Sequence, residues 1–533
     1  MSESKNDPAL HSAIQENSDK MTPIGVVAPS LRIVFPALML VMLLAALDQT
    51  IVSTALPTIV GEMGGLDRLS WVVTAYLLAS TIVVPIYGKL GDLFGRKIVI
   101  QAAIVIFLVG SALCGLAQTM MELVLLRALQ GLGGGGLMVV AMAAIGDVIP
   151  PAERGKYQGY FGAVFGVSTV IGPLLGGFLV EHFSWRWIFY LNLPLGALAL
   201  VAIAAAFKPH VAHIRRQIDY WGAGFLALAL TGITLFATEG GTSLPWGSVE
   251  LWMTLAVGLI GLAGFIQEQR SAPEPLLPLH LFRIRTFALA CAISFVVGFA
   301  MFGAITFVPL YLQVVKGSTP SQAGLQMVPM MGGLLAASIL SGRWISKKGK
   351  YRAFPIAGTF LAAMGMLLLS RVSLASPLSQ MYESLVVLGV GLGLVMQVLV
   401  LAAQNAVEIA SMGVATSSVT LFRSIGGSIG VAFFGAFFSS SLHERLARLI
   451  GGDQALPESL RPSAIQALPT MLKASYLNAF SNSLHGVYLS AAAFVAIAFM
   501  LSVFIKNAPL RKRAGPEQEA AEASPLSPPT AGE

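Results

Sequence analysis

A carboxylate stands deep inside the first long apolar stretch of the chain, in the segment LDQTIV at residues 47–52. Asp48 lies roughly fifteen residues, or about 22 Å of helix, from the start of that stretch. If the stretch spans a membrane, an ionisable group at this depth is costly and is usually retained for a function. Such an acid can bind and release a proton. The alternative is an uncharged acid that packs in a helix interface.

A second set of polar side chains lies in the segment RALQGLGGGG at residues 127–136. By their spacing, Arg127, Gln130, Gly131 and Gly134 share one face of a helix. Because arginine keeps its proton, Arg127 needs an acceptor or water inside an apolar stretch. Counted from the same membrane face, Arg127 and Asp48 stand at similar depths. A direct or water-mediated contact between them is sterically possible; otherwise Arg127 snorkels to the surface.

Long apolar stretches must position these residues. The chain has 533 residues, of which 56% are hydrophobic and 11% charged, whereas soluble domains carry about 25% charged residues. A spanning helix needs about 20 apolar residues. We therefore predict an all-α polytopic membrane protein with fourteen spans, near residues 33–56, 70–90, 98–117, 122–142, 157–181, 187–207, 222–240, 250–268, 287–312, 323–343, 354–372, 381–403, 413–440 and 486–506.

The basic residues indicate the orientation of the chain. Alternate loops carry most of them, and the short loops between carry only Arg68, Arg186, Lys316 and Arg371. Since basic loops stay on the cytoplasmic side, we expect a multi-pass protein of the cell membrane with both termini in the cytoplasm. The long outer segment 441–485 has leucines on one helical face, so it is either an amphipathic helix on the outer surface or a polar loop.

An internal repeat suggests the domain organisation. The segment GKLGDLFGRK at 88–97 follows span 2, and GRWISKKGK at 342–350 follows span 10 with the same glycine spacing. Duplicated halves are common in secondary transporters. We expect two six-helix bundles with two additional helices between them. The predicted parts are a tail at 1–31, a first bundle at 32–207, the extra helices at 208–286, a second bundle at 287–506 and a tail at 507–533.

Two further patterns concern helix packing and a polar surface. Small residues that let helices approach closely line the fifth predicted span at Gly166, Gly172, Pro173, Gly176 and Gly177. In the twelfth span, Gln397 and Asn405 belong to a polar face, which is either the wall of a substrate cavity, together with Gln130, or a set of interhelical hydrogen bonds.

Taken together, the segments at 47–52, 88–97, 127–136 and GVSTVIGPLLGG at 166–177 resemble the major facilitator superfamily. Within that family, residues 33–506 are similar to the fourteen-helix drug:proton antiporters. The resemblance implies two six-helix bundles plus two central helices, and export of small hydrophobic or amphipathic compounds by alternating access.

The resemblance also implies roles for single residues. Asp48 and Arg127 would couple transport to the proton, which is the only coupling ion expected, with no other cofactor. A latch on the inner side would consist of Gly88, Asp92, Gly95 and Arg96, and would favour the outward-facing state. The glycines and Pro173 of the fifth span would seal the two halves. The expected partners are drug-like small molecules and membrane lipid; nucleic acid is not expected, and accessory export proteins are left open.

Other functions are less consistent with the sequence. The chain has no Gly-x-x-x-x-Gly-Lys-Ser/Thr loop for a nucleotide, and its seven histidines and two cysteines form no metal-ligand pattern. An enzyme embedded in the membrane would need clustered acids and histidines near one face, and a sensor would usually carry a folded soluble domain. Neither is evident, so we do not expect an enzyme. Export of a single lipid, siderophore or metabolite stays an alternative to multidrug efflux.

Overall fold

The computed structural model describes residues 31–63, 69–149, 151–207, 219–240, 244–408, 411–450 and 470–506. Within these ranges the chain is helical apart from turns and one isolated bridge between Gly240 and Leu244. Eleven of the described helices are long and apolar enough to cross a membrane. The prediction of an all-α, multi-pass membrane protein is therefore confirmed, whereas the count of fourteen crossings stays a prediction.

Each predicted apolar stretch coincides with one helix or with one broken helix. The first half contains α2 (Leu31–Met63), α3 (Leu69–Phe94), α4 (Arg96–Leu116), α5 (Met120–Val148), α6 (Pro151–His182), α7 (Trp187–Tyr190) and α8 (Asn192–Ala206). Two helices follow, α9 (Tyr220–Glu239) and α10 (Val249–Ser271). The second half contains the short η2 (Leu279–Arg283), α11 (Arg285–Ile305), α12 (Phe307–Val314), α13 (Pro320–Gln326), α14 (Val328–Lys348), α15 (Ala353–Leu369), α16 (Leu378–Ala406), α17 (Met412–Ile450) and α19 (Thr470–Val503).

Prolines explain where three predicted spans are broken. The breaks between α7 and α8, α11 and α12, and α13 and α14 precede Pro194, Pro309 and Pro329 by two or three residues. Proline lacks the N–H that would bond the preceding turn, and its ring clashes with the carbonyl four residues earlier. The chain therefore starts a new helix at these points, and one of them makes Asn192 the first residue of α8.

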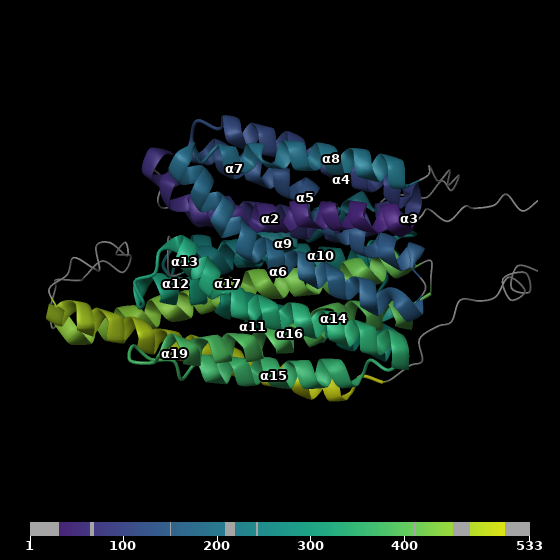
Figure 1. The fold of residues 1–533 in the computed structure, drawn as a ribbon. Coiled ribbons are helices and arrows are strands. Elements are labelled where there is room, and N and C mark those ends of the chain that lie inside the picture. Colours follow the sequence, from purple (N-terminus) through teal and green to yellow (C-terminus); the bar gives the residue numbers. More distant parts are fainter. Residues whose placement is uncertain are drawn as a thin grey trace, which may run out of the picture.

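The helices lie side by side in two bundles, with purple-to-blue helices above and green-to-yellow helices below in Figure 1. In the first bundle α5 packs against α3 and α4; in the second, α16 packs against α14 and α15. The bundles meet where α6 packs against α14 and where α3 packs against α17. The extra pair, α9 and α10, pack against each other, and α9 also contacts α3 and α17.

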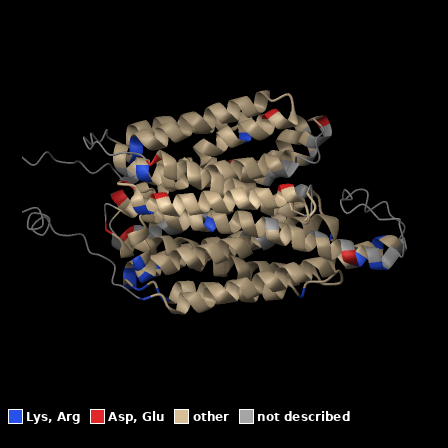
Figure 2. Cartoon of the chain, turned by 180° about the vertical axis from the view of Figure 1, so that it is seen from behind, with Lys and Arg blue, Asp and Glu red and all other residues tan. Residues whose placement is uncertain are grey.

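Charged residues lie mostly at the two ends of the helices, with uncharged residues between them (Figure 2). Lys and Arg gather mainly at one end of the helices (Figure 2). In the sequence, Lys89 lies near the end of α3, Arg96 starts α4, and Lys347 and Lys348 end α14. This distribution suits a membrane-embedded middle, because charged side chains are costly in hydrocarbon.

The ends of α3 and α14 at the basic side of the molecule, which the sequence predicts to be the inner side, support the internal repeat. α3 ends next to Gly95, whose φ is 81°, and α14 ends next to Gly349, whose φ is 68°. Gly95 and Gly349 occupy equivalent positions of the two repeated segments, and both have a positive φ, which glycine adopts without strain. The two turns differ in ψ, which is 147° at Gly95 and 10° at Gly349, so the copies share a positive-φ glycine directly after the helix and not one turn type.

The outer segment differs from the prediction. α17 continues without a break to Ile450, so residues 441–450 extend the span and do not form a separate surface helix. Leu442 and Leu446 are buried. Residues 451–469 lie outside the described part of the chain. Figure 1 shows α19, with the end of α17, extending beyond the other helices.

Candidate functional site

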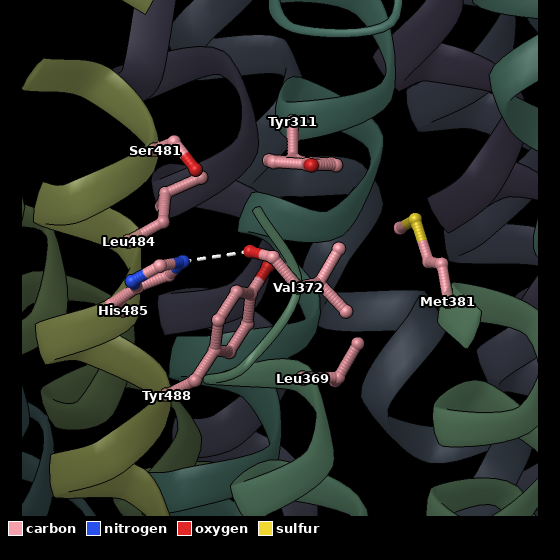
Figure 3. Close-up of a pocket in the computed structure, with 8 residues that line it drawn as sticks. All are labelled: Tyr311, Leu369, Val372, Met381, Ser481, Leu484, His485 and Tyr488. Atoms are coloured by element: carbon pink, nitrogen blue, oxygen red, sulfur yellow. Dashed lines mark hydrogen bonds between the residues drawn. The ribbon is translucent and has the colours of Figure 1, made fainter. Parts of the chain in front are cut away.

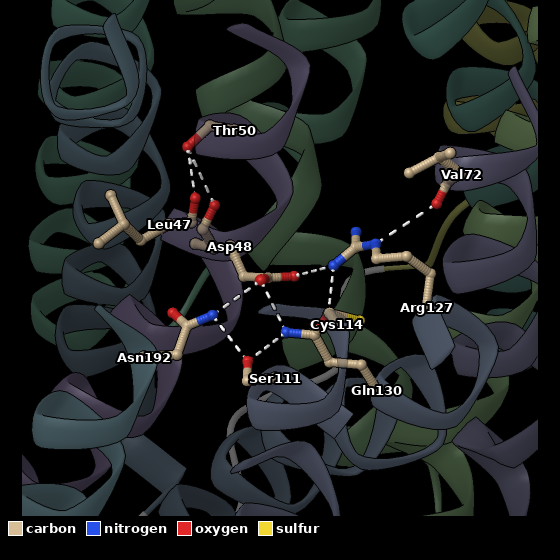
Figure 4. A network of polar contacts seen from close by, with 10 residues as sticks. Leu47, Asp48, Thr50, Val72, Ser111, Cys114, Arg127, Gln130 and Asn192 are labelled. Carbon is tan, nitrogen blue, oxygen red and sulfur yellow. Dashed lines mark hydrogen bonds and ion pairs between the residues drawn. The ribbon is translucent and has the colours of Figure 1, made fainter. Parts of the chain in front are cut away.

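Asp48 forms the centre of a closed polar network in the first bundle (Figure 4). Its carboxylate is completely buried and accepts three hydrogen bonds. Arg127 Nη1 donates to Oδ2 at 2.8 Å, whereas Gln130 Nε2 at 2.8 Å and Asn192 Nδ2 at 2.9 Å donate to Oδ1. Three donors around one buried carboxylate stabilise its charged form.

Arg127 is held from several sides. Its guanidinium also donates to Gln130 Oε1 at 2.6 Å and to the Val72 carbonyl at 3.4 Å, and it lies 4.2 Å from the centre of the Tyr76 ring. Its exposed fraction is 1%, so Arg127 does not snorkel to the surface. The structure thus brings Asp48 and Arg127 into direct contact as a buried ion pair, which a low-dielectric interior tolerates because its net charge is zero.

Two residues of the network were not predicted as site residues. Ser111 Oγ accepts from Gln130 Nε2 at 2.5 Å and from Asn192 Nδ2 at 2.9 Å, which links both amides to one hydroxyl. Asn192 belongs to the sequence Asn-Leu-Pro at the start of α8, so the proline two residues later is a sequence signal for its place at a helix start. Ser111 is a single serine in the apolar α4, and nothing in the sequence marks it as a site residue.

The network belongs to one bundle, because its members come from α2, α3, α4, α5 and α8. Gln130, which the sequence suggested as a cavity residue, is fully buried within it. Gln130 both donates to Asp48 and accepts from Arg127, so it fixes the geometry of the ion pair. Any effect of Asp48 on the second bundle must therefore pass through helix packing.

A short contact connects α2 with α6 two residues after Asp48. Thr50 Oγ1 donates to the Ser168 carbonyl at 2.9 Å. A Cβ atom added at Gly172 would lie 2.2 Å from Thr50 Oγ1, so only glycine permits this approach. The first part of α6 faces α14 of the other bundle, where a Cβ at Gly166 would lie 2.9 Å from Leu335 Cδ2.

The small residues of α6 therefore serve both bundles, since Gly172 faces α2 and Gly166 faces α14. Gly176 and Gly177 continue the same helix, and Gly176 is buried. Pro173 also lies in α6, but its side chain is outside the described part of the structure. The predicted sealing of the two halves stays a prediction, although α6 does lie between them.

The inner end of α3 contacts the second bundle at Gly88. A Cβ at Gly88 would lie 2.6 Å from Ser417 Oγ of α17 and 3.2 Å from the Gly413 carbonyl, so α3 and α17 touch at their inner ends. Arg96 Nε donates to Asp147 Oδ2 of α5 at 2.7 Å. The predicted latch residue Asp92 lies at the end of α3, and its side chain is outside the described part.

The extra helix pair is tied to α3 at both ends. Near the outer end, Trp71 Nε1 donates to Glu239 Oε1 at 2.8 Å. Near the inner end, Lys89 forms an ion pair with Glu274, which follows α10. Both ties join the pair to the first bundle.

The polar face of α16 divides into two parts. Near the inner end, Gln404 Nε2 donates to Thr416 Oγ1 of α17 at 2.8 Å, so Gln404 serves interhelical bonding. Asn405 beside it is buried. Two turns further out, Gln397 is also buried, and its Oε1 has no hydrogen-bond partner among the described residues.

A small cavity lies in the second bundle between α12, α16, α19 and the turn after α15 (Figure 3). There the ring of His485 donates through Nε2 to the Val372 carbonyl at 2.7 Å, and the buried Ser481 hydroxyl has no hydrogen-bond partner among the residues that the structure describes. The cavity belongs to one bundle, so it is not the cleft between halves that alternating access requires. In the described part of the chain, no group of three or more His, Cys, Asp or Glu residues could hold a metal ion.

Known proteins are similar to this chain over most of its length. An uncharacterized MFS-type transporter of Mycobacterium tuberculosis is 44% identical over 483 residues, which cover 90% of this chain and 70% of the relative. The multidrug transporter protein MdtP of Bacillus subtilis is 41% identical over 76% of this chain and 74% of its own length. Multidrug resistance protein 3 of Bacillus subtilis is 36% identical over 79% and 83%.

Solved structures agree in fold. The human organic anion transporter MFSD10 (TETRAN) superposes with a TM-score of 0.61 at 13% identity, covering 89% of this chain and 100% of that one. The proton:xylose symporter XylE gives 0.59 at 14% identity, covering 92% and 98%. The family model of the Major Facilitator Superfamily matches residues 38–431. By its sequence and its fold, the chain therefore belongs to the major facilitator superfamily, whose members are transporters and not enzymes.

Proposed function

We propose that this transporter exports small hydrophobic or amphipathic compounds in exchange for protons. The observation that carries the proposal is the buried pair of Asp48 and Arg127. A carboxylate in the middle of a span is the kind of group that binds a coupling proton. The names of the multidrug relatives, at 41% and 36% identity, support efflux as the direction of transport.

Protonation of Asp48 has a definite structural consequence. A neutral carboxyl group no longer attracts Arg127 as a counter-ion, and its proton must find an acceptor. Arg127 keeps Gln130 Oε1, the Val72 carbonyl and the face of Tyr76 as partners. Because these partners come from α3 and α5, proton binding loosens α2 from α5 without leaving the arginine unsolvated.

The path from this pair to the second bundle runs through α6. Movement of α2 carries Thr50, which holds α6 at Ser168, and α6 packs against α14. Alternating access needs this kind of coupling, because the proton and the substrate must be released on opposite sides. The contact of Gly88 with Ser417 supports a state that is closed on the inner side.

The membrane and the orientation belong to the same proposal. We assign the end rich in Lys and Arg to the cytoplasm, following the preference of basic loops for that side. Both termini are then cytoplasmic, and the protein lies in the cell membrane. Protons would enter from outside as compounds leave.

Reconstituted vesicles test the proposal. Amphipathic probes with negative, zero and positive charge are offered to vesicles with an imposed pH gradient, and their accumulation is followed. We expect accumulation against a concentration gradient that stops when a protonophore collapses the pH gradient. Accumulation of no probe, or accumulation that persists without the gradient, would contradict proton-coupled export.

A further inference from the structure

Arg423 is a second arginine within a membrane-spanning helix. It lies eleven residues after the start of α17 at Met412, which places it about 16 Å along the helix. This depth is close to the middle of a hydrocarbon layer of about 30 Å. Its carbonyl lies against Gly298, since a Cβ there would be 2.2 Å from that oxygen, so Arg423 stands beside α11.

Arg423 has no protein counter-ion in the part of the chain that the structure describes. Its half-buried side chain forms none of the ion pairs or hydrogen bonds found there. The described acids of the second bundle are Glu383 and Glu408, exposed at the two ends of α16, and Glu444, which pairs with Arg448. In contrast, Arg127 has Asp48 at 2.8 Å.

The register of α16 and α17 places Gln397 at the same depth. The two helices are antiparallel, and Gln404 bonds Thr416 across them. Gln397 is seven residues before Gln404, and Arg423 is seven residues after Thr416. Seven residues make two helical turns to within about 20°. Gln397 therefore lies on the same side of α16 as Gln404, and Arg423 lies on the same side of α17 as Thr416. Both residues are about 10 Å further out than that hydrogen bond.

Gln397 also lacks a partner. It is 7% exposed, and its buried Oε1 accepts no hydrogen bond from the described residues. Buried amide oxygens are nearly always bonded. Arg423 and Gln397 thus lie at one depth on neighbouring helices, the first without a counter-ion and the second without a hydrogen-bond donor in the described part of the chain. A polar ligand between them could supply both.

The inner side of this position is closed. A Cβ at Gly146 of α5 would lie 2.6 Å from Met412 Cε and 3.4 Å from Gln404 Nε2, so the first bundle meets α16 and α17 directly below it. A ligand at Arg423 would thus lie near the membrane centre, beyond the inner contact between the halves. Secondary transporters hold their substrates at this depth.

We propose that Arg423 and Gln397 form the polar end of the substrate site, and that this site takes amphipathic molecules with a carboxylate or sulfonate group. The inference rests on the proposed export function, whose substrate class it names. The guanidinium donates two hydrogen bonds to the anion in the planar geometry that arginine offers. The Gln397 amide donates to the same group or accepts from a neighbouring N–H or O–H of the ligand.

Equilibrium binding to the whole protein in lipid nanodiscs tests this site without a pH gradient. The probes are 4-pentylbenzoate, 4-pentylbenzamide and 4-pentylbenzylamine, which share shape and differ in charge, with a second set built on naphthalene. Empty nanodiscs correct for partition into lipid. We expect the carboxylate of at least one set to bind at least about tenfold more tightly than its amide, because hydrogen bonds to charged groups are the stronger ones.

Variants assign the preference to the arginine. Arg423→Gln should abolish the preference for the carboxylate and leave amide binding within about twofold, whereas Arg423→Lys should keep part of the preference. Arg445→Gln removes the same charge from an exposed position of the same helix and should change nothing. If Arg423→Gln does not fold, Gln397→Leu takes its place and should weaken carboxylate binding severalfold.

The outcomes separate this inference from the export proposal. Equal binding of the three probes, preference for the amine, or no binding in either set would overturn the anion site. So would a carboxylate preference that survives Arg423→Gln, or unchanged binding in Gln397→Leu. Loss of proton-driven accumulation with intact carboxylate preference would instead contradict the export proposal alone.

Discussion

The contact between Asp48 and Arg127 could be anticipated from the type and the depth of these two residues. An acid and an arginine in apolar stretches are so costly that their depth alone predicted a possible contact. The structure places them 2.8 Å apart. The supporting residues Ser111 and Asn192 could not be predicted as partners, because a hydroxyl and an amide carry no comparable cost. The bond from Asn192 to Asp48 spans 144 positions of the sequence and depends on the packing of α8 against α2.

Replacing Arg127 by alanine should move the pH profile of transport to higher pH. Without its counter-ion, the charged form of the buried Asp48 carboxylate becomes less favourable. Breaking a buried pair by removing one partner costs about 3–5 kcal/mol, so turnover should also fall. The measurement is the initial rate of pH-driven efflux between pH 5 and 9. Arg186→Ala, at a partly exposed arginine, serves as control, and an unchanged profile in Arg127→Ala would show that the two residues are not coupled.

The positions of helices followed from apolar length, whereas their breaks and ends did not. Prolines broke three predicted spans, but Pro85 lies inside α3 without ending it. Tertiary contacts decide whether the lost hydrogen bond is tolerated. The continuation of α17 to Ile450 was also missed. A helix that lies on a membrane surface and a helix that extends a span and packs through Leu442 and Leu446 have the same amphipathic sequence pattern.

The close contact between α2 and α6 predicts that a larger residue at Gly172 lowers the stability of the protein. Gly172→Ala places a methyl group 2.2 Å from Thr50 Oγ1, and overpacking of this kind costs about 1–3 kcal/mol. Thermal unfolding of the purified protein should show a lower midpoint. Combining the change with Thr50→Ala should recover part of the loss, because the oxygen is removed.

The matched control is Gly224→Ala in α9, where an added Cβ meets nothing within 4 Å. If Gly172→Ala proves as stable as Gly224→Ala, α2 and α6 do not approach as closely as the structure has them.

For the whole molecule, the decisive contacts are those between bundles. The repeat and the family resemblance predicted two halves, and the fold agrees. The residues that touch at the inner end could not be predicted, because Gly88 and Ser417 belong to different halves and their contact depends on how the halves pack. The extra helices α9 and α10 were predicted as spans, but their ties through Glu239 and Glu274 to α3 were not, because acids near span ends usually face water.

Gly88→Ala should open the inner side. The added methyl group lies 2.6 Å from Ser417 Oγ and near the Gly413 carbonyl, so the closed state loses stability relative to the state in which α3 and α17 separate. A loss of about 1.4 kcal/mol changes the population ratio tenfold. Spin-label distances between the inner ends of α3 and α17 should then lengthen. Gly435→Ala, in α17 with no atom within 4 Å of the added Cβ, should leave them unchanged; equal distances in both variants would argue against this contact as the inner closure.

The central claim is that Asp48 carries the coupling proton, and one measurement tests it most directly. Asp48→Asn keeps the size of the side chain but cannot bind and release a proton, and its amide oxygen can still accept hydrogen bonds from the donors around it. Vesicles with the purified variant, checked for correct insertion, are given the same pH gradient and probes as the unchanged protein. We expect accumulation driven by the gradient to disappear, while exchange of probe across the membrane at equal concentrations continues. Full pH-driven accumulation by correctly inserted Asp48→Asn would contradict the account.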